Sequence, residues 1–193
     1  MKHVKELELT LVKRIKRYHE DFTLPLMAEL WEEILYRSLL DIGLDSKWDN
    51  DRSHKVGEDI YEKTYGRISC KSGALSKDSV KFNGSRTTKF KTLEEKLEFL
   101  SSDHDDCYFM LAKNKKDIDN KNFKYKVLIF SSSLCRVNKL NWEEKFNKTG
   151  KLSGWKGTGD FNAEINRSMS DQLWLTLPLD MVEHIIEIDG NPS

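Results

Sequence analysis

The sequence predicts an α/β fold in which a mixed central β-sheet lies between layers of α-helices. Two short, continuous apolar runs, residues 107–112 and 125–130, are typical of strands that are covered on both faces. Apolar residues recur at intervals of three to four in residues 4–20, 27–42 and 92–101, which predicts three amphipathic helices. Strands and helices that alternate in this way favour a sheet flanked by helices.

The ends of these helices are marked by local residue choices. Residues 23–25, Thr-Leu-Pro, end the first helix, and Gly43 closes the second as a C-terminal glycine does. Thr92 and Glu95 form the capping-box pattern at the start of the third. Near the C-terminus, residues 173–177 predict a strand, and residues 178–188 predict a short helix followed by an edge strand.

The segment from residue 56 to residue 73 combines hairpin spacing with chemically active side chains. Asp59 precedes a short apolar run, residues 63–66 form a turn, and the second run contains Ser69-Cys70-Lys71. Alternation along a strand places Ser69 and Lys71 on one face. A lysine is costly to bury without an anion, and Asp59 is the nearest one across the turn. This group suits a divalent metal and a phosphate, although a structural hairpin with a surface lysine is the alternative.

Asp59, a turn and then Ser69-Cys70-Lys71 resemble the PD-(D/E)xK motif, and residues 27–130 are similar to the catalytic core of type II restriction endonucleases in their Ser-x-Lys variant. The resemblance implies a restriction-endonuclease-like fold and a Mg²⁺ cofactor that Mn²⁺ can replace. It implies that Asp59 and the backbone carbonyl of Cys70 bind the metal and that Ser69 replaces the usual second carboxylate. Lys71 would orient or activate the attacking water.

The resemblance also requires a further carboxylate from a helix. Trp31-Glu32, eleven residues before Gly43, matches the aromatic-glutamate step of the family's first helix, so Glu32 is expected to be a catalytic and metal-binding residue. Glu29 and Glu33 are the next candidates. The alternative is that all three are ordinary glutamates that face solvent near a helix N-terminus. In the Ser-x-Lys enzymes a later helix supplies the replacement, which here leaves three candidates: Glu94, Glu95 and Glu98.

The charge distribution suggests a nucleic-acid partner although the net charge is zero. Residues 63–156 contain 21 basic and 11 acidic side chains, whereas the counts are 10 and 14 before them and 1 and 7 after them. A basic middle suits a phosphate backbone, and solubility is the alternative reason for it. The segment from residue 72 to residue 91 is expected to be a loop that contacts DNA through four basic residues: Lys77, Lys81, Arg86 and Lys89.

Other predicted DNA contacts lie outside this segment. The polar segments 44–57 and 131–160 are expected to be loops, the first bordering the DNA and the second contacting it. Six polar residues before the strand at 173–177 are candidates for base readout, with turn and capping roles as alternatives: Asn166, Arg167, Ser168, Ser170, Asp171 and Gln172.

We therefore expect one endonuclease domain over residues 1–193, with residues 131–193 completing the sheet and recognising DNA. The expected activity is Mg²⁺-dependent cleavage of double-stranded DNA at a short palindromic site by a homodimer. A structure-specific nuclease of the same fold and a non-catalytic DNA-binding protein are the alternatives. The composition gives no membrane span or signal peptide, so a cytoplasmic protein of a prokaryotic cell is expected, with a methyltransferase in the same system but not in direct complex.

Overall fold

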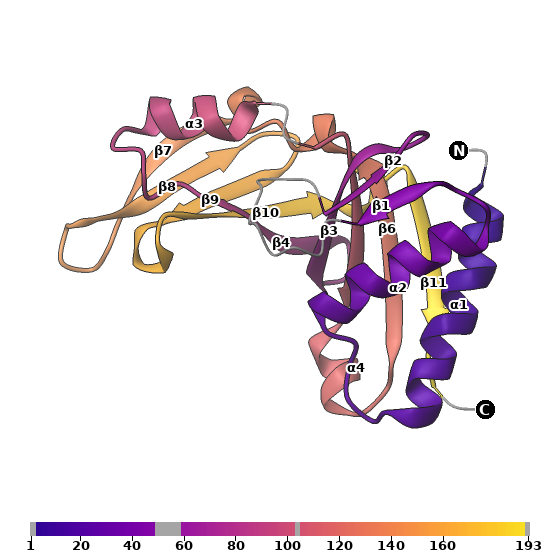
Figure 1. Cartoon of the computed structure of the whole chain (residues 1–193). Helices are drawn as coiled ribbons and strands as arrows, with labels where there is room; N and C mark the ends of the chain where they lie inside the picture. The colour runs from indigo at the N-terminus through magenta and orange to yellow at the C-terminus, as the bar shows by residue number, and fades with distance from the viewer. Residues whose placement is uncertain (1–2, 49–58, 103–104, 192–193) are drawn as a thin grey trace.

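The computed structural model describes residues 3–48, 59–102 and 105–191 of the chain. It is a mixed α/β structure with a large sheet flanked by helices (Figure 1). The helices are α1 (Val4–Asp21), α2 (Ala28–Asp41), α3 (Leu93–Ser101) and α4 (Lys115–Asp119). The strands are β1 (Ser46–Trp48), β2 (Ile60–Glu62), β3 (Gly66–Leu75), β4 (Ser79–Arg86), β5 (Cys107–Lys113), β6 (Lys124–Ser131), β7 (Asn141–Phe146), β8 (Leu152–Thr158), β9 (Asn162–Asn166), β10 (Gln172–Pro178) and β11 (His184–Asp189). Short 3₁₀ turns span Ser132–Cys135, Val137–Lys139, Arg167–Met169 and Leu179–Met181.

In the described part of the chain these strands form one 11-stranded sheet with the order β11-β6-β5-β3-β4-β10-β9-β8-β7, and β2 pairs with both β1 and β3. The pair β3 and β5 is parallel, and the other pairs are antiparallel. The prediction of a mixed sheet between helices is confirmed. The segment after residue 130 contributes strands at both ends of this order.

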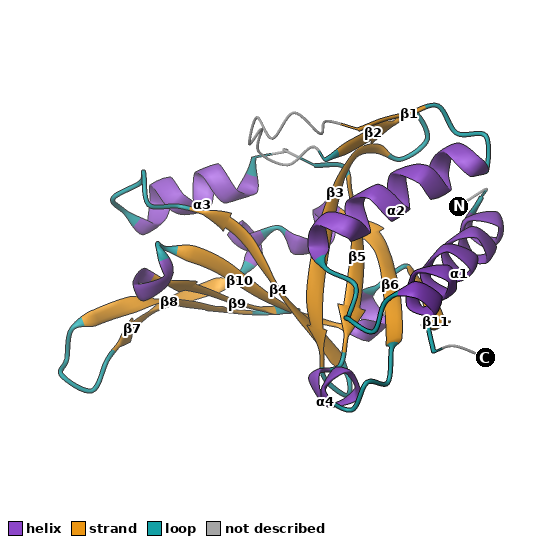
Figure 2. Cartoon of the chain, turned by 60° about the horizontal axis from the view of Figure 1, so that its bottom comes forward, coloured by secondary structure: helices purple, strands orange, loops and turns teal. Residues whose placement is uncertain are grey.

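The sheet divides into two parts that extend in different directions (Figures 1 and 2). One part, called the body here, contains β3, β5, β6 and β11 with α1 and α2. The other part, called the arm, contains β4, β10, β9, β8 and β7, with α3 over one face. The two parts join where the last residues of β3, Gly73 to Leu75, pair with β4. We call this place the junction.

Two hydrophobic clusters occupy opposite faces of the sheet because side chains alternate along each strand. Phe109 and Leu111 of β5 belong to the cluster beneath α1 and α2. Met110 and Ala112 belong to the cluster that continues onto the arm, where leucines of α3 pack against it. The body is therefore covered on both faces, whereas the second face of the arm has no helix among the described residues.

Two segments that were predicted to be loops are strands, and these predictions are wrong. The 72–91 segment contains the end of β3 and all of β4, and the 131–160 segment contains β7 and β8. In β4, buried Val80 and Phe82 alternate with exposed Lys81 and Asn83. β4 is rich in polar residues because one of its faces is open to solvent. Its composition therefore resembles that of a loop. The predicted border loop contains β1 at residues 46–48, and its residues 49–57 lie outside the described residues.

Helix α2 is fixed to the sheet by Trp31 and ends as predicted at Gly43. The fully buried Trp31 donates its indole N–H to the carbonyl oxygen of Phe109 on β5 at 3.1 Å. At the other end, the N–H groups of Gly43 and Leu44 donate to Leu40 and Leu39 in a Schellman arrangement, with Gly43 at φ +78°. These contacts fix the position of the residue that follows Trp31, Glu32.

Replacing Trp31 with phenylalanine is expected to lower the free energy of unfolding by about 1–3 kcal/mol, because the buried carbonyl of Phe109 loses its indole donor. Urea denaturation measures this change. Trp174→Phe is the matched control, since the indole N–H of Trp174 has no partner among the described residues, and its cost should stay below about 1 kcal/mol. Equal costs for the two variants would contradict the anchoring role of Trp31.

Candidate active site

The candidate site lies on one edge of β3, where the strand is unpaired between two neighbours. β2 pairs with Gly66 to Ile68, and β4 pairs with Gly73 to Leu75. In the described part of the chain, residues 69–72 have no strand partner on this side, and their other side pairs with β5. We call residues 69–72 of this side the open edge.

The turn before the open edge is held firmly in place. Gly66 has φ +74°, and a Cβ atom there would lie 2.5 Å from a carboxylate oxygen of Asp106. That carboxylate accepts hydrogen bonds from the backbone N–H and the guanidinium of Arg67 at 2.8–3.1 Å. The predicted hairpin is therefore present, and its turn is attached to the start of β5.

Asp59 caps the open edge through its carboxylate. Its backbone N–H donates to Ile68, and its Oδ2 accepts the N–H of Cys70 at 2.6 Å. Ser69 Oγ also approaches Oδ2, at 3.4 Å. In a strand, the N–H and C=O of one residue point to the same side, so the carbonyl of Cys70 also faces this edge. The structure thus places Asp59 beside the backbone group that was predicted to bind metal.

Glu32 approaches the same edge from α2. Burial and the nearby charge of Asp59 together raise its pKa from 4.5 to about 7, and Lys71 opposes part of the shift. Two carboxylates and a lysine therefore lie close enough to influence one another. Glu33 pairs instead with Arg37 on the helix surface at 2.7 Å. Of the glutamates predicted on this helix, Glu32 is the one that the structure brings to Asp59, whereas Glu29 adds only a minor charge effect.

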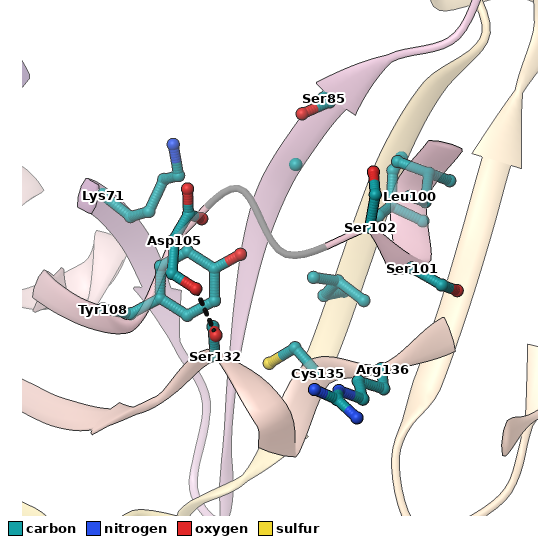
Figure 3. A pocket seen from close by; sticks show the side chains of 13 residues that line it. Lys71, Ser85, Leu100, Ser101, Ser102, Asp105, Tyr108, Ser132, Cys135 and Arg136 are labelled. Atoms are coloured by element: carbon teal, nitrogen blue, oxygen red, sulfur yellow. Dashed lines mark hydrogen bonds between the residues drawn. The ribbon is translucent and has the colours of Figure 1, made fainter. Parts of the chain in front are cut away.

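Lys71 points from β3 into a small pocket of about 80 Å³ beside the junction with the arm (Figure 3). Asp105, Tyr108 and Ser132 lie on the same side of this pocket, opposite Ser101 and Ser102. Ser132 Oγ donates to the backbone carbonyl of Asp105 at 2.7 Å. The pocket has room for two or three water molecules at roughly 30 Å³ each.

Ser69 and Cys70 have supporting roles in this geometry. Ser69 is fully buried, so its hydroxyl orients Asp59 and has no exposed surface for a ligand. Burial raises the pKa of Cys70 well above its ordinary value, and the charges of Asp59 and Glu32 raise it further. The thiol therefore stays protonated at neutral pH and is a poor nucleophile.

The donor set suits a hard cation with few protein ligands. Within the described residues, no group of three or more histidine, cysteine, aspartate and glutamate side chains could hold a metal ion. Mg²⁺ commonly binds through one or two carboxylates, keeps several waters and takes phosphate oxygens from its substrate. Asp59, Glu32 and the carbonyl of Cys70 fit that pattern.

The other predicted metal ligands lie on α3, which covers the arm. Glu95 accepts the N–H groups of Lys91 and Thr92 in the predicted capping box, and these bonds lower its pKa. Glu94 and Glu98 are exposed. The charges that act on buried Cys70 come from Asp59, Glu32 and Lys71. Glu32 is thus the helix glutamate that the structure places with Asp59.

The predicted DNA-binding lysines and arginine follow β4. Lys77 is in the turn before it, Lys81 is on its open face, Arg86 ends it and Lys89 lies in the next loop. All four side chains are exposed. An eight-residue strand is about 27 Å long, so the four positions are distributed along the junction and arm instead of forming one cluster.

The six predicted base-reading residues lie in and beside the turn between β9 and β10. Asn166 and Gln172 are cross-strand partners, and Gln172 also donates to the carbonyl of Gly84 at 3.3 Å. Three others in the turn, Arg167, Ser168 and Ser170, are exposed.

Asp171 has a structural partner instead. Its carboxylate accepts a hydrogen bond from the buried ammonium of Lys96 at 2.8 Å, and its backbone carbonyl accepts from the N–H and hydroxyl of Thr87. Lys96 also donates to the carbonyls of Thr87 and Phe90. These bonds fix α3 to the β9–β10 turn.

Several residues around the site were not predicted from the sequence. Asp105, Tyr108 and Ser132 line the pocket of Lys71; Asp105 precedes β5, Tyr108 lies in β5, and Ser132 follows β6. Tyr108 faces Lys71 because it pairs with Ser69 in the parallel β3–β5 register. That register could not be derived from residue spacing. The pair Asp105-Asp106, directly before the apolar run of β5, was the one signal in the sequence that polar groups lie at the start of this strand.

Comparisons with protein-family models, with curated proteins and with solved structures found no match. Among the described residues, no helix is long and apolar enough to cross a membrane.

The raised pKa of Glu32 gives a stability prediction with a defined sign. Because the pKa rises from an ordinary value of 4.5 to about 7 on folding, the protonated form is favoured in the folded state. Ionisation of Glu32 therefore destabilises the fold increasingly from pH 4.5 to 7, and fully above pH 7. Glu32→Gln should stabilise the metal-free protein at pH 8 by about 1–2 kcal/mol, since solvent screens part of the effect, and much less at pH 5.

Urea denaturation at both pH values, in the presence of a chelator, measures this difference. Glu33→Gln is the control, because Glu33 forms a surface pair with Arg37, and it should not stabilise the protein at pH 8. A pH-independent effect of Glu32→Gln would contradict the proposed environment of Glu32.

Proposed function

We propose that this protein is a Mg²⁺-dependent endonuclease that hydrolyses phosphodiester bonds in double-stranded DNA at a short, specific sequence, as type II restriction endonucleases do. The observation that supports this most strongly is the carboxylate of Asp59 held against the N–H of Cys70 at the open edge, directly before Lys71, with Glu32 near enough for their charges to act on it. A half-buried carboxylate whose pKa rises to about 7 beside a second carboxylate is unfavourable for folding alone. Such an arrangement is typical of functional sites.

The residues of the site have different roles in hydrolysis. In the reaction a water oxygen adds to phosphorus, one P–O ester bond breaks, and the departing oxygen takes a proton. Lys71 is a cation next to a pocket that admits water, so it orients the attacking water and stabilises negative charge that grows on the phosphate. Ser69 positions Asp59 through its hydroxyl.

Asp59, Glu32 and the carbonyl of Cys70 would hold the metal. Bound Mg²⁺ supplies Lewis-acid polarisation of the phosphate and lowers the pKa of its water. Glu32 would lose its proton to serve as a ligand, because a metal prefers the ionised carboxylate. Metal affinity would therefore increase with pH as Glu32 loses its proton.

Sequence recognition would come from the arm and the β9–β10 turn. A palindromic site presents two equivalent strands, so two copies of the chain would act together. The exposed Lys81, Arg86 and Lys89 would contact phosphates, and Asn166 with Gln172 would face base edges.

Incubation of the purified protein with phage-sized duplex DNA and Mg²⁺ tests this proposal on an agarose gel. The wild type should give discrete fragments, whereas Asp59→Asn and Lys71→Ala should each lower the rate by about 10²-fold or more. Asparagine keeps an oxygen that can accept the N–H of Cys70, so the open edge should stay folded. Lys13→Ala, an exposed lysine on α1, is the control and should cleave normally.

The pattern of products distinguishes the outcomes. A smear of fragments would support a nuclease without sequence preference, and cleavage of four-way junctions alone would support a structure-specific nuclease. If the wild type cuts none of these substrates with Mg²⁺ or Mn²⁺, the proposal of a nuclease is wrong.

A further inference from the structure

A second pocket, of about 370 Å³, lies where the open face of the arm meets the body. The residues that matter for its chemistry come from β3, β4, β5, α4 and β10: Ser72, Lys81, Asn83, Lys113, Lys115 and Trp174. Its volume is within the range of pockets that bind small ligands, which begins at about 300 Å³. It is separate from the small pocket that Lys71 enters, because no residue lines both.

Two residues that line this pocket each have a buried polar atom without a partner among the described residues. Among the described residues, neither the hydroxyl of Ser72 nor the indole N–H of Trp174 has a hydrogen-bond partner, although both atoms are buried. A buried polar atom without a partner costs about 1–3 kcal/mol, so such atoms are usually explained by a ligand or an ordered water. Both groups can donate, and an indole can only donate. A ligand that pairs with both must therefore present acceptor atoms.

The positive charge of the pocket also favours a ligand with acceptor atoms, and in particular an anion. Three lysines line it, and none of its described lining residues is acidic. Lys81 lies over the ring of Trp174, with its ammonium 5.6 Å from the ring centroid. Lys113 donates to the carbonyl of Leu26, and burial lowers its pKa. Lys115 is exposed and has a free path to a ligand. An oxyanion fits this set of donors.

The pocket is adjacent to the open edge along the chain. Ser72 directly follows Lys71, at a Cα separation of about 3.8 Å, and its side chain points to the opposite face of the strand. The two pockets therefore lie on opposite faces of β3, on either side of the open edge. An extended polymer that passes this edge would reach both.

The open face of the arm continues from this pocket. Directly opposed residues in antiparallel strands share a face, and Trp174 opposes Asn83 on β4 and Glu164 on β9. Glu164 in turn opposes Lys156 on β8 and pairs with Lys145 at 3.4 Å. Glu143 on β7 also opposes Lys156 on this face. Lys145 and Lys156 therefore balance the two glutamates, and the excess positive charge of the face lies at the pocket.

We propose that this pocket binds the sugar-phosphate backbone of a DNA strand beside the scissile phosphate, with Lys81 and Lys115 contacting phosphate oxygens and Trp174 donating its indole N–H. This inference rests on the proposed nuclease function. It adds Ser72, Lys115 and Trp174 to the substrate contacts, and it gives the face of the arm away from α3 a role in guiding the strand to the open edge.

Binding of a fluorescein-labelled 20-base-pair duplex, with Ca²⁺ in place of Mg²⁺ and at 50–250 mM salt, tests this proposal by fluorescence anisotropy. Lys81→Gln and Lys115→Gln should each weaken binding about 3- to 10-fold at 100 mM salt and reduce the slope of log K against log salt by about 1. Trp174→Phe should weaken binding about threefold and leave the slope unchanged. Lys13→Gln should bind as the wild type does, and thermal unfolding checks that each variant is folded.

Wild-type affinity and slope in both Lys115→Gln and Trp174→Phe would overturn this inference. If the wild type cleaves DNA while these variants bind and cleave normally, only the pocket is wrong. If the salt slopes change as expected but no protein cleaves DNA, only the nuclease function is wrong. Saturable quenching of tryptophan fluorescence by inorganic phosphate or a deoxynucleoside monophosphate at micromolar concentration, lost in Trp174→Phe, would identify a small anion as the occupant and overturn the assignment to a strand.

Discussion

The pairing of β3 determines where chemistry can occur in this fold. β3 is parallel to β5 along most of its length, but its other side pairs with β2 at the start and β4 at the end. Backbone groups alternate along a strand, so among residues 69–72 those of Cys70 and Ser72 face outward in the described structure, and Asp59 accepts the N–H of Cys70. Because the two neighbours of β3 diverge, the open edge lies where the arm leaves the body.

Electrostatics at the open edge are unbalanced without a ligand. α2 is fixed by the indole of Trp31, so Glu32 cannot move away from Asp59 without loss of a buried hydrogen bond. Burial and the charge of Asp59 raise the pKa of Glu32 to about 7, although Lys71 opposes the shift. A cation between the carboxylates would relieve their repulsion, which gives the proposed metal a physical reason independent of any motif.

The sequence predicted the elements with strong periodicity and the local chemistry, but not the contacts between distant strands. α1, α2, α3, β5 and β6 have apolar spacing or continuous apolar runs that can be identified directly. Asp59 and Lys71 were predicted because they are close in the chain. β4, β7 and β8 were missed because one of their faces is polar. Asp105, Tyr108 and Trp174 were missed because their positions depend on strand register, which residue spacing does not determine.

The arm has one face covered by α3 and one open face, and buried polar contacts hold α3 in this position. Lys96 is buried with Asp171 and two carbonyls, and breaking such a set leaves an uncompensated charge, which costs about 3–5 kcal/mol. α3 and the β9–β10 turn are therefore held on one side of the arm sheet. Side chains alternate along β4 and β10, so Lys81 and Trp174 face away from α3, toward the side where the body supplies Lys113 and Lys115. Because Lys96 and Asp171 hold α3 on one side of the arm, the other side stays open beside these lysines.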